Sequence, residues 1–160
     1  MTSSSRRLRS GPGGATESVV DAESNRPLLE VLRSELGVRS ASRGCRDGSC
    51  GACRVLLDGV IVASCRVAWS DVKDGAQVET YEGLASDPAA ARAVEAYEQE
   101  RPTRCRMCVG ALGVTAVAIA RGRASLVAGA TQPDEAIEAA LLEATCLCTG
   151  RGSWRRALSK

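Results

Sequence analysis

Eight cysteines, arranged in two sets of different spacing, constrain this chain of 160 residues more than any other feature. The first set is Cys45, Cys50, Cys53 and Cys65, with the spacing C-x4-C-x2-C-x11-C. The second set is Cys105, Cys108, Cys146 and Cys148, a C-x2-C pair followed after a long gap by a C-x-C pair. Four thiols are enough ligands for one metal centre, so the sequence predicts two centres on one chain.

The spacing of the first set is that of a plant-type 2Fe–2S cluster, in which a tight loop supplies three thiolates and a remote cysteine the fourth. Such a loop bends sharply and turns backbone N–H groups towards the sulfurs, which explains Gly44, Gly48 and Gly51. The second set fits either a 2Fe–2S cluster or a four-cysteine zinc site, because C-x2-C pairs occur in both. On spacing alone this choice stays open.

Composition narrows the class of protein. Hydrophobic residues make up 44% of the chain but aromatic residues only 2%, so the core must consist mainly of Leu, Val and Ala. A net charge of +2 favours neither a nucleic-acid partner nor a membrane surface. No apolar run is long enough to span a bilayer, and the arginine-containing segment 5–9 lacks the apolar stretch of an export signal. We therefore expect a cytoplasmic protein, without membrane insertion, whose cysteines bind metal instead of forming a disulfide scaffold.

Local signals predict an α+β domain after a disordered tail. Residues 1–17 are rich in Ser, Arg and Gly and are expected to be disordered. Residues 18–85 are expected to form the first domain, with a helix that Asn25 caps and Gly37 ends. Its strands are expected at 17–22 and 77–81, and around a hairpin turn at Asp58-Gly59.

Residues 86–160 are expected to form a second, all-helical domain. Helices are predicted over 89–100, 108–120 and 150–158, and another begins at Pro133. The segment 108–120 is apolar nearly all round, so it should be buried against other helices. The second cysteine set falls at the ends of these helices, where exposed N–H groups favour thiolates.

Six arginines lie within two positions of a cysteine, namely Arg43, Arg46, Arg54, Arg66, Arg104 and Arg106. Positive charge there would stabilise thiolates and raise cluster reduction potentials. The alternative is that they are ordinary surface residues of an arginine-rich chain. The chain has no histidine to act as a base, and no nucleotide-binding motif occurs. The sequence thus predicts a chain that carries electrons and performs no substrate chemistry itself.

Between Pro27 and Arg156 the chain resembles the small iron–sulfur subunit of the molybdenum hydroxylases, the family of xanthine dehydrogenase, aldehyde oxidoreductase and carbon monoxide dehydrogenase. The resemblance rests on Pro27-Leu-Leu-Glu-Val-Leu-Arg, Gly44-Cys-Arg-Asp-Gly-Ser-Cys-Gly-Ala-Cys, Asp58-Gly59, Val62-Ala-Ser-Cys65, Thr80-Tyr-Glu-Gly-Leu84 and Cys146-Leu-Cys-Thr-Gly150. The order of both cysteine sets also agrees, which favours iron–sulfur over zinc for the second set.

The resemblance implies a β-grasp, plant-type ferredoxin domain followed by a four-helix bundle, each with one 2Fe–2S cluster. It implies partner subunits, a large one with molybdopterin-bound molybdenum and a medium one with FAD, in a heterotrimer or a dimer of heterotrimers. Electrons would pass from molybdenum through the second and then the first cluster to FAD or another acceptor. No nucleic acid is among the expected partners.

Arg104 and Cys148 are the candidate contacts to molybdopterin that the resemblance implies. Arg104 stands where the family usually has a pterin-binding Gln, and Cys148 aligns with the cysteine that approaches the pterin. Arg106 and Leu147 also depart from the usual residues beside the ligands. Two alternatives follow from these departures and from the spacing: a divergent two-cluster ferredoxin with a different redox partner, and a zinc-stabilised adaptor.

Overall fold

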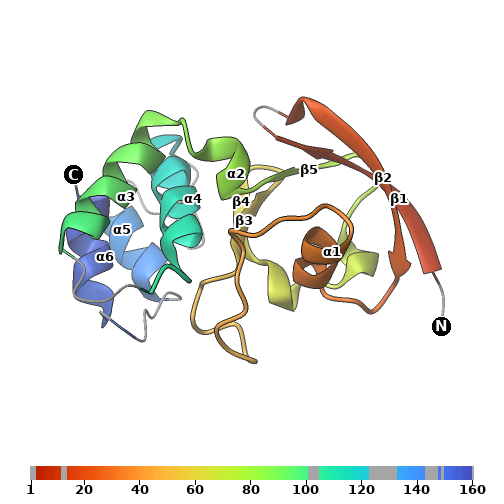
Figure 1. Cartoon of the computed structure of the whole chain (residues 1–160), viewed down its shortest axis with the longest axis horizontal. Helices are drawn as coiled ribbons and strands as arrows, with labels where there is room; N and C mark the ends of the chain where they lie inside the picture. The colour runs from red at the N-terminus through yellow and green to blue at the C-terminus, as the bar shows by residue number, and fades with distance from the viewer. Residues whose placement is uncertain are drawn as a thin grey trace.

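The computed structural model describes residues 3–11, 14–100, 105–122, 133–142, 148 and 150–159. The strands are β1 (Ser3–Ser10), β2 (Thr16–Glu23), β3 (Arg54–Leu57), β4 (Val60–Ala63) and β5 (Ala76–Glu79). The helices are α1 (Leu28–Ser34), α2 (Tyr81–Leu84), α3 (Pro88–Glu100), α4 (Val109–Ala120), α5 (Pro133–Leu142) and α6 (Gly150–Leu158). Two short 3-10 helices, η2 (Ser64–Arg66) and η3 (Trp69–Asp71), follow β4. All strands, α1 and α2 form what we call the sheet half, and α3 to α6 form the helical half (Figure 1).

The sheet half is a five-stranded mixed sheet with α1 beside it. The strand order is β2-β1-β5-β3-β4, with β1 parallel to β5 and every other neighbouring pair antiparallel. Leu28, Leu29 and Val31 of α1 are fully buried in one core with Val55 and Val78 of the sheet. This arrangement confirms the α+β class and fits a ferredoxin-like domain.

The predicted hairpin is confirmed. Leu57 of β3 pairs with Val60 of β4, and Asp58 (φ 51°) and Gly59 (φ 80°) form the turn between them. Both turn residues are left-handed, as a two-residue hairpin with matching strand twist requires. This hairpin fixes the direction in which the chain returns to Cys65.

The prediction that residues 1–17 are disordered is wrong for the described residues of this segment, 3–11 and 14–17. Ser3–Ser10 forms β1, which lies between β2 and β5, and only Leu8 among its side chains is buried. Side chains that are distant in the sequence stabilise the strand: the Arg7 backbone N–H donates to the Asp74 carboxylate, and the Trp69 indole N–H donates to the Ser4 carbonyl at 2.8 Å. Because these hydrogen bonds hold the strand, β1 does not need a buried apolar face, and its sequence shows no apolar alternation.

The expected cap of α1 is also wrong. Pro27, and not Asn25, occupies the N-cap position, without a side-chain hydrogen bond. The Leu28 N–H donates to the Val67 carbonyl at 2.8 Å, so a residue of a distant loop is the hydrogen-bond acceptor for the first backbone N–H of the helix. The helix ends at Ser34, shortly before Gly37, whose φ of 65° turns the chain away.

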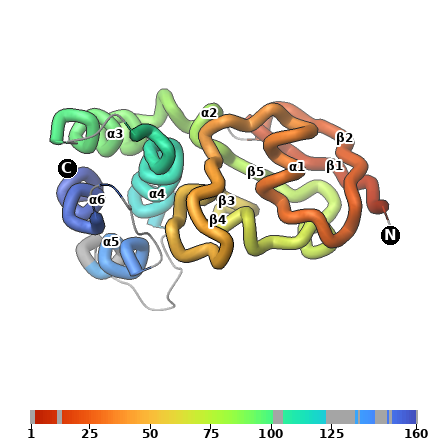
Figure 2. Tube along the Cα trace, turned by 60° about the horizontal axis from the view of Figure 1, so that its bottom comes forward, coloured from red at the N-terminus to blue at the C-terminus, as the bar shows by residue number. Residues whose placement is uncertain are grey.

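The four predicted helices of the helical half are present, and Figure 2 shows them gathered at one end of the molecule. α4 is buried from Val109 to Ala118, as its apolar sequence predicts. Glycines let α4 approach the sheet half closely. A Cβ at Gly113 would lie 2.5 Å from the Tyr81 ring, and one at Gly110 would lie 2.8 Å from the Ser40 carbonyl oxygen. The two halves therefore share a close, well-packed junction.

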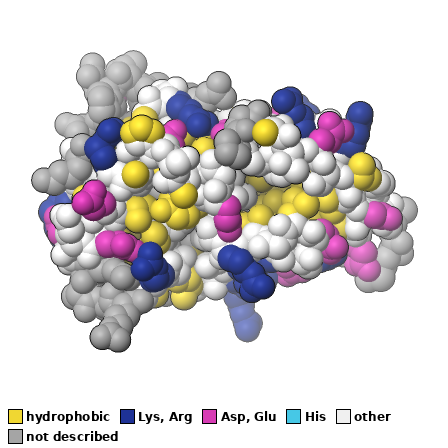
Figure 3. Space-filling view, turned by 45° about the horizontal axis from the view of Figure 1, so that its top comes forward, with side chains coloured by type: hydrophobic (Ala, Val, Ile, Leu, Met, Phe, Trp, Pro, Cys, Tyr) yellow, Lys and Arg dark blue, Asp and Glu magenta, His cyan; other side chains and the backbone are white. Residues whose placement is uncertain are grey.

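The surface carries charges of both signs. On the face in Figure 3, basic and acidic side chains are interspersed around a central band of hydrophobic ones. In the part of the chain that the structure describes, no helix has both the length and the apolar character to cross a membrane.

Candidate metal centres

The first cysteine set lies on the loop that runs from α1 to β3 and on η2. Figure 1 shows this loop between the two halves, projecting at the lower edge of the view. Within the loop, backbone N–H groups already donate to sulfur. The Cys50 N–H lies 3.4 Å from the Cys45 Sγ, and the Ala52 N–H lies 3.5 Å from the Cys50 Sγ. Such donors stabilise thiolates, which are the form that binds iron.

Ser64 brings the remote ligand, Cys65, to this loop. Its hydroxyl donates to the Cys53 carbonyl at 2.7 Å, and its backbone N–H donates to the same oxygen at 3.3 Å. Ser64 is fully buried, so water does not compete for these bonds. η2 thereby places the side chain of Cys65 beside that of Cys53, closing the set of four.

The pKa values of the thiols reflect this convergence. Burial, then the nearby thiols of Cys53, Cys45 and Cys50, raise the pKa of Cys65 to about 12. Burial also raises the pKa of Cys50. Burial disfavours the Cys45 thiolate, but the Cys50 N–H and other donors outweigh it and leave the Cys45 pKa below its ordinary value. A bound cation would favour the thiolate forms of Cys50 and Cys65, whose ionisation burial and the neighbouring thiols oppose.

The three glycines of the loop have separate roles. Gly48 (φ 85°) and Gly51 (φ 68°) adopt left-handed backbone conformations that favour glycine. Gly44 instead provides space, because a Cβ there would lie 2.9 Å from the Cys50 Sγ and 3.2 Å from the Met107 sulfur. All three predicted loop glycines are thus required by the local geometry.

Side chains of α1 and α2 hold the chain segment that enters the loop. Arg33 donates to the Ala41 carbonyl at 2.8 Å, and Glu30 forms an ion pair with Arg43. Glu82 of α2 accepts the backbone N–H groups of Arg39 and Ser40, both at 2.7 Å. Burial opposes ionisation of Glu82, but these donors and the Ser40 hydroxyl lower its pKa to about 2.

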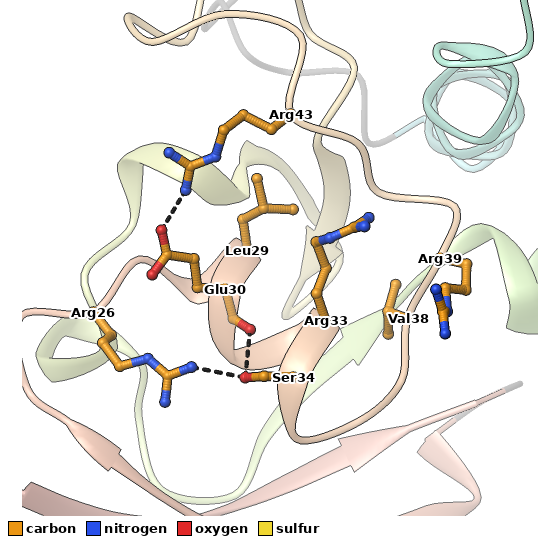
Figure 4. Close-up of a pocket in the computed structure, with 8 residues that line it drawn as sticks. All are labelled: Arg26, Leu29, Glu30, Arg33, Ser34, Val38, Arg39 and Arg43. Atoms are coloured by element: carbon orange, nitrogen blue, oxygen red, sulfur yellow. Dashed lines mark hydrogen bonds and ion pairs between the residues drawn. The ribbon is translucent and has the colours of Figure 1, made fainter.

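A surface depression lies over this same segment, and no cysteine lines it. Its volume is about 480 Å³, and Figure 4 shows its lining residues just before α1, on α1 and on the chain that follows: Arg26, Leu29, Glu30, Arg33, Ser34, Val38, Arg39 and Arg43. Arg26, Arg33 and Arg43 each bind a neighbouring protein group. These bonds brace α1 and the approach to the cluster loop.

The second set is only partly within the described residues. Cys108 is buried at the N-cap of α4, Cys105 is partly exposed and Cys148, just before α6, is exposed. The Sγ of Cys108 lies 3.6 Å from the Tyr97 hydroxyl oxygen. Arg104, Cys146 and Leu147 lie outside the described residues, so the molybdopterin contacts and the fourth ligand stay predictions.

The buried indole of Trp154 is consistent with a cluster bound near the second cysteine set. Its indole Nε1 is buried and has no hydrogen-bond partner in the described structure. Trp154 belongs to the same core cluster as Cys108. A buried donor without a partner costs about 1–3 kcal/mol, and a cluster sulfur is an acceptor that would satisfy it.

Described residues of the two cysteine sets come together at the junction of the halves. Gly44, which precedes Cys45, approaches Met107, which precedes Cys108. Cys50 and Cys108 are buried in one hydrophobic cluster, against which Cys45 also packs. Described ligands of both sets therefore share one hydrophobic cluster.

Arg54, the residue after Cys53, joins the halves directly. It is 3% exposed, and its Nη1 donates to Thr115 Oγ1 at 3.2 Å while its Nη2 donates to the Ala140 carbonyl at 2.7 Å. Its guanidinium carbon also lies 5.9 Å from the centre of the Trp154 ring. The structure describes four more of the arginines that lie near cysteines, and all four are exposed: Arg43, Arg46, Arg66 and Arg106. This is the result expected if these four are ordinary surface residues.

In the described ranges, no three His, Cys, Asp or Glu side chains converge as ligands of one metal ion. A 2Fe–2S cluster does not require this arrangement, because each iron takes two thiolates and inorganic sulfide completes its coordination. The donor set, four thiols with backbone N–H groups aimed at sulfur, fits such a cluster.

Sequence reasoning did not find Ser64, Glu82 or Tyr97. Ser64 was identifiable as the neighbour of Cys65, but its bond to the Cys53 carbonyl depends on how β3 pairs with β4. Glu82 lies in Thr80-Tyr-Glu-Gly-Leu84, one of the motifs behind the resemblance, but its bonds to the backbone of Arg39 and Ser40 depend on the fold. Nothing in the local sequence of Tyr97 distinguishes it from an ordinary helix residue.

Comparisons with known proteins agree with this geometry. Residues 13–85 match the 2Fe-2S iron-sulfur cluster binding domain. The chain is 31% identical over 137 residues to the nicotinate dehydrogenase small FeS subunit of Eubacterium barkeri, covering 86% of this chain and 82% of that subunit. It is 48% identical over 65 residues to an aldehyde oxidoreductase of Megalodesulfovibrio gigas, which is 41% of this chain but 7% of that protein.

A solved structure extends the likeness to almost the whole chain. The quinoline 2-oxidoreductase of Pseudomonas putida 86 matches with a TM-score of 0.74 and 25% identity, covering 98% of this chain and 91% of the matched chain. The chain thus belongs to the family of small iron–sulfur subunits of the molybdenum hydroxylases.

Proposed function

We propose that this chain relays electrons through two 2Fe–2S clusters within a molybdenum hydroxylase or dehydrogenase. Cys45, Cys50, Cys53 and Cys65 would hold the first cluster, and Cys105, Cys108, Cys146 and Cys148 the second. The helical half would be the four-helix-bundle domain of the family. The observation that carries the proposal is that Cys50 of the first set and Cys108 of the second are buried in one hydrophobic cluster, against which Cys45 also packs.

The residues of this chain have three tasks in such a relay. Backbone N–H groups of the first loop stabilise the charge on cluster sulfur. The hydrophobic cluster around Cys50 and Cys108 excludes water, which lowers the local dielectric and limits reorganisation during electron transfer. The Arg54 bonds fix the two cysteine sets at one separation. The clusters themselves supply the one-electron chemistry.

The partner subunits are part of the proposal. A large subunit with molybdopterin-bound molybdenum would deliver electrons to the second cluster, and a medium subunit with FAD, or another acceptor, would receive them from the first. The assembly would be a heterotrimer or a dimer of heterotrimers in the reducing cytoplasm, where thiolate ligands persist. Several relatives are named as small subunits of such dehydrogenases or hydroxylases, including the nicotine 6-hydroxylase of Paenarthrobacter nicotinovorans.

Native purification tests this assembly. A tagged chain expressed in its own cells should bring down two further subunits, a large one with molybdenum and a medium one with FAD. Recovery of the chain with both clusters but with a different redox partner would contradict the assembly and favour a divergent ferredoxin. Recovery of zinc without acid-labile sulfide would contradict the relay and favour a zinc-stabilised adaptor.

A further inference from the structure

The hydroxyl of Tyr97 lies against the sulfur of Cys108 inside the helical half. The oxygen and the Sγ are 3.6 Å apart, Tyr97 is 1% exposed and Cys108 is 6% exposed. Both belong to a core cluster that also contains Val94, Leu112 and Trp154. The contact is therefore dry, and a hydrogen bond in such surroundings is stronger than one exposed to water.

Helix packing holds this contact in place. Tyr97 lies on the buried face of α3 with Ala90, Ala93 and Val94, at the spacing of one helix stripe. Cys108 ends the connection from α3 and serves as the N-cap of α4. Because α3 packs along α4, the tyrosine hydroxyl has a fixed position beside the sulfur.

The direction of the hydrogen bond depends on what Cys108 binds. A tyrosine hydroxyl and a free thiol can each donate to the other. A cysteine that ligates iron is a thiolate and has no hydrogen, so Tyr97 must then be the donor. Adding an electron to the cluster increases the negative charge on its sulfurs, which makes this donor more favourable in the reduced state.

We propose that Tyr97 sets the reduction potential of the second cluster by donating a hydrogen bond to the Cys108 ligand sulfur. The inference rests on the proposed function, because it requires that Cys108 ligate a 2Fe–2S cluster. Hydrogen bonds to cluster sulfur are among the factors that raise cluster potentials. Tyr97 is a positioning and tuning residue that touches a ligand, and it does not take up electrons itself.

The chain offers a matched pair of variants, since it contains two tyrosines. Tyr97→Phe removes the hydroxyl and keeps the ring that fills the core. Tyr81→Phe makes the same chemical change on a partly buried ring that packs against α4 at Gly113, and among the described residues no cysteine bonds to this hydroxyl. The two substitutions separate loss of the hydrogen bond from a general effect on α4.

The experiment is a redox titration of the purified complex, followed by electron paramagnetic resonance of each cluster. In Tyr97→Phe we expect the reduced-to-oxidised ratio of the second cluster to fall about fivefold at a fixed potential, the factor typical of one net hydrogen bond. At 59 mV per tenfold change for one electron, this is a midpoint about 40 mV more negative. The first cluster, and both clusters in Tyr81→Phe, should titrate as in the wild type.

Three results would overturn the inference. They are an unmoved second cluster in Tyr97→Phe, an equal shift in both variants, and loss of iron from Tyr97→Phe alone, which would assign Tyr97 to cluster retention. Wild-type protein without a second cluster signal would instead contradict the proposed function. The iron content and the spectrum of the wild type thus distinguish the two failures.

Discussion

Replacement of Arg54 by methionine tests how the sheet half and the helical half are joined. The arginine extends from the strand that follows Cys53 into the helical half, where it binds Thr115 of α4 and the Ala140 carbonyl of α5. Methionine fills much of the same volume but donates no hydrogen bond. Arg54→Met therefore removes the bonds and leaves the packing largely intact.

The expected loss can be worked from these contacts. Hydrogen bonds from a charged donor contribute about 1.5–3 kcal/mol each, so the two bonds give about 3 kcal/mol at the lower end. The Trp154 ring, at 5.9 Å, adds about 0.5 kcal/mol. Removing a buried guanidinium also recovers its desolvation cost, which offsets part of the loss. We expect the free energy of unfolding to fall by about 2–3 kcal/mol.

Urea unfolding of the full chain with its clusters, followed by helical circular dichroism, measures this change. Arg66→Met is the control, because Arg66 also follows a cysteine of the first set but is exposed. An exposed substitution of this kind should change stability by no more than about 0.5 kcal/mol. If Arg54→Met unfolded at the same urea concentration as the control, Arg54 would not join the halves and the argument would be refuted.

Three further predictions follow from other contacts. Gly44→Ala should lower the occupancy of the first cluster, measured as iron and sulfide per chain, because its Cβ would lie 2.9 Å from the Cys50 Sγ; unchanged occupancy would contradict this. Gly113→Ala should lower the free energy of unfolding, measured by thermal unfolding, by about 1–3 kcal/mol through overpacking, since its Cβ would lie 2.5 Å from the Tyr81 ring. A variant more stable than the wild type would show that this contact is loose. Glu82, with a pKa of about 2 against an ordinary 4.5, is ionised more readily in the folded chain than in the unfolded one. Its contribution to stability is therefore complete above about pH 4.5 and is lost as the pH falls towards 2. Between these pH values the free energy of unfolding should fall less in Glu82→Gln than in the wild type, as measured by unfolding at a series of pH values.

The sequence predicted the parts of the fold that depend on local signals. The Asp58-Gly59 turn, the apolar α4 and the cysteine loop with its glycines are each specified by neighbouring residues, and the structure contains all three. The convergence of the first four cysteines also followed from their spacing alone, although metal binding by them stays a prediction.

The sequence failed where distant partners decide the structure. β1 has almost no apolar pattern, because hydrogen bonds to β2, β5 and residues near Asp74 stabilise it in place of a buried face. The start of α1 is satisfied by the Val67 carbonyl, so Asn25 is not needed as a cap. Arg54, which joins the halves, and Tyr97, which joins α3 to the start of α4, likewise act between separate elements, and spacing within one segment does not reveal such contacts.

The most direct test of the two-cluster relay is a combined iron, sulfide and zinc analysis of the full chain and of two single-ligand variants. The account predicts about four irons and about four acid-labile sulfides per wild-type chain, without zinc. Cys53→Ser and Cys108→Ser should each retain about half of both, and their reduced spectra should lack different clusters. Zinc in place of iron, or loss of the same cluster in both variants, would contradict it.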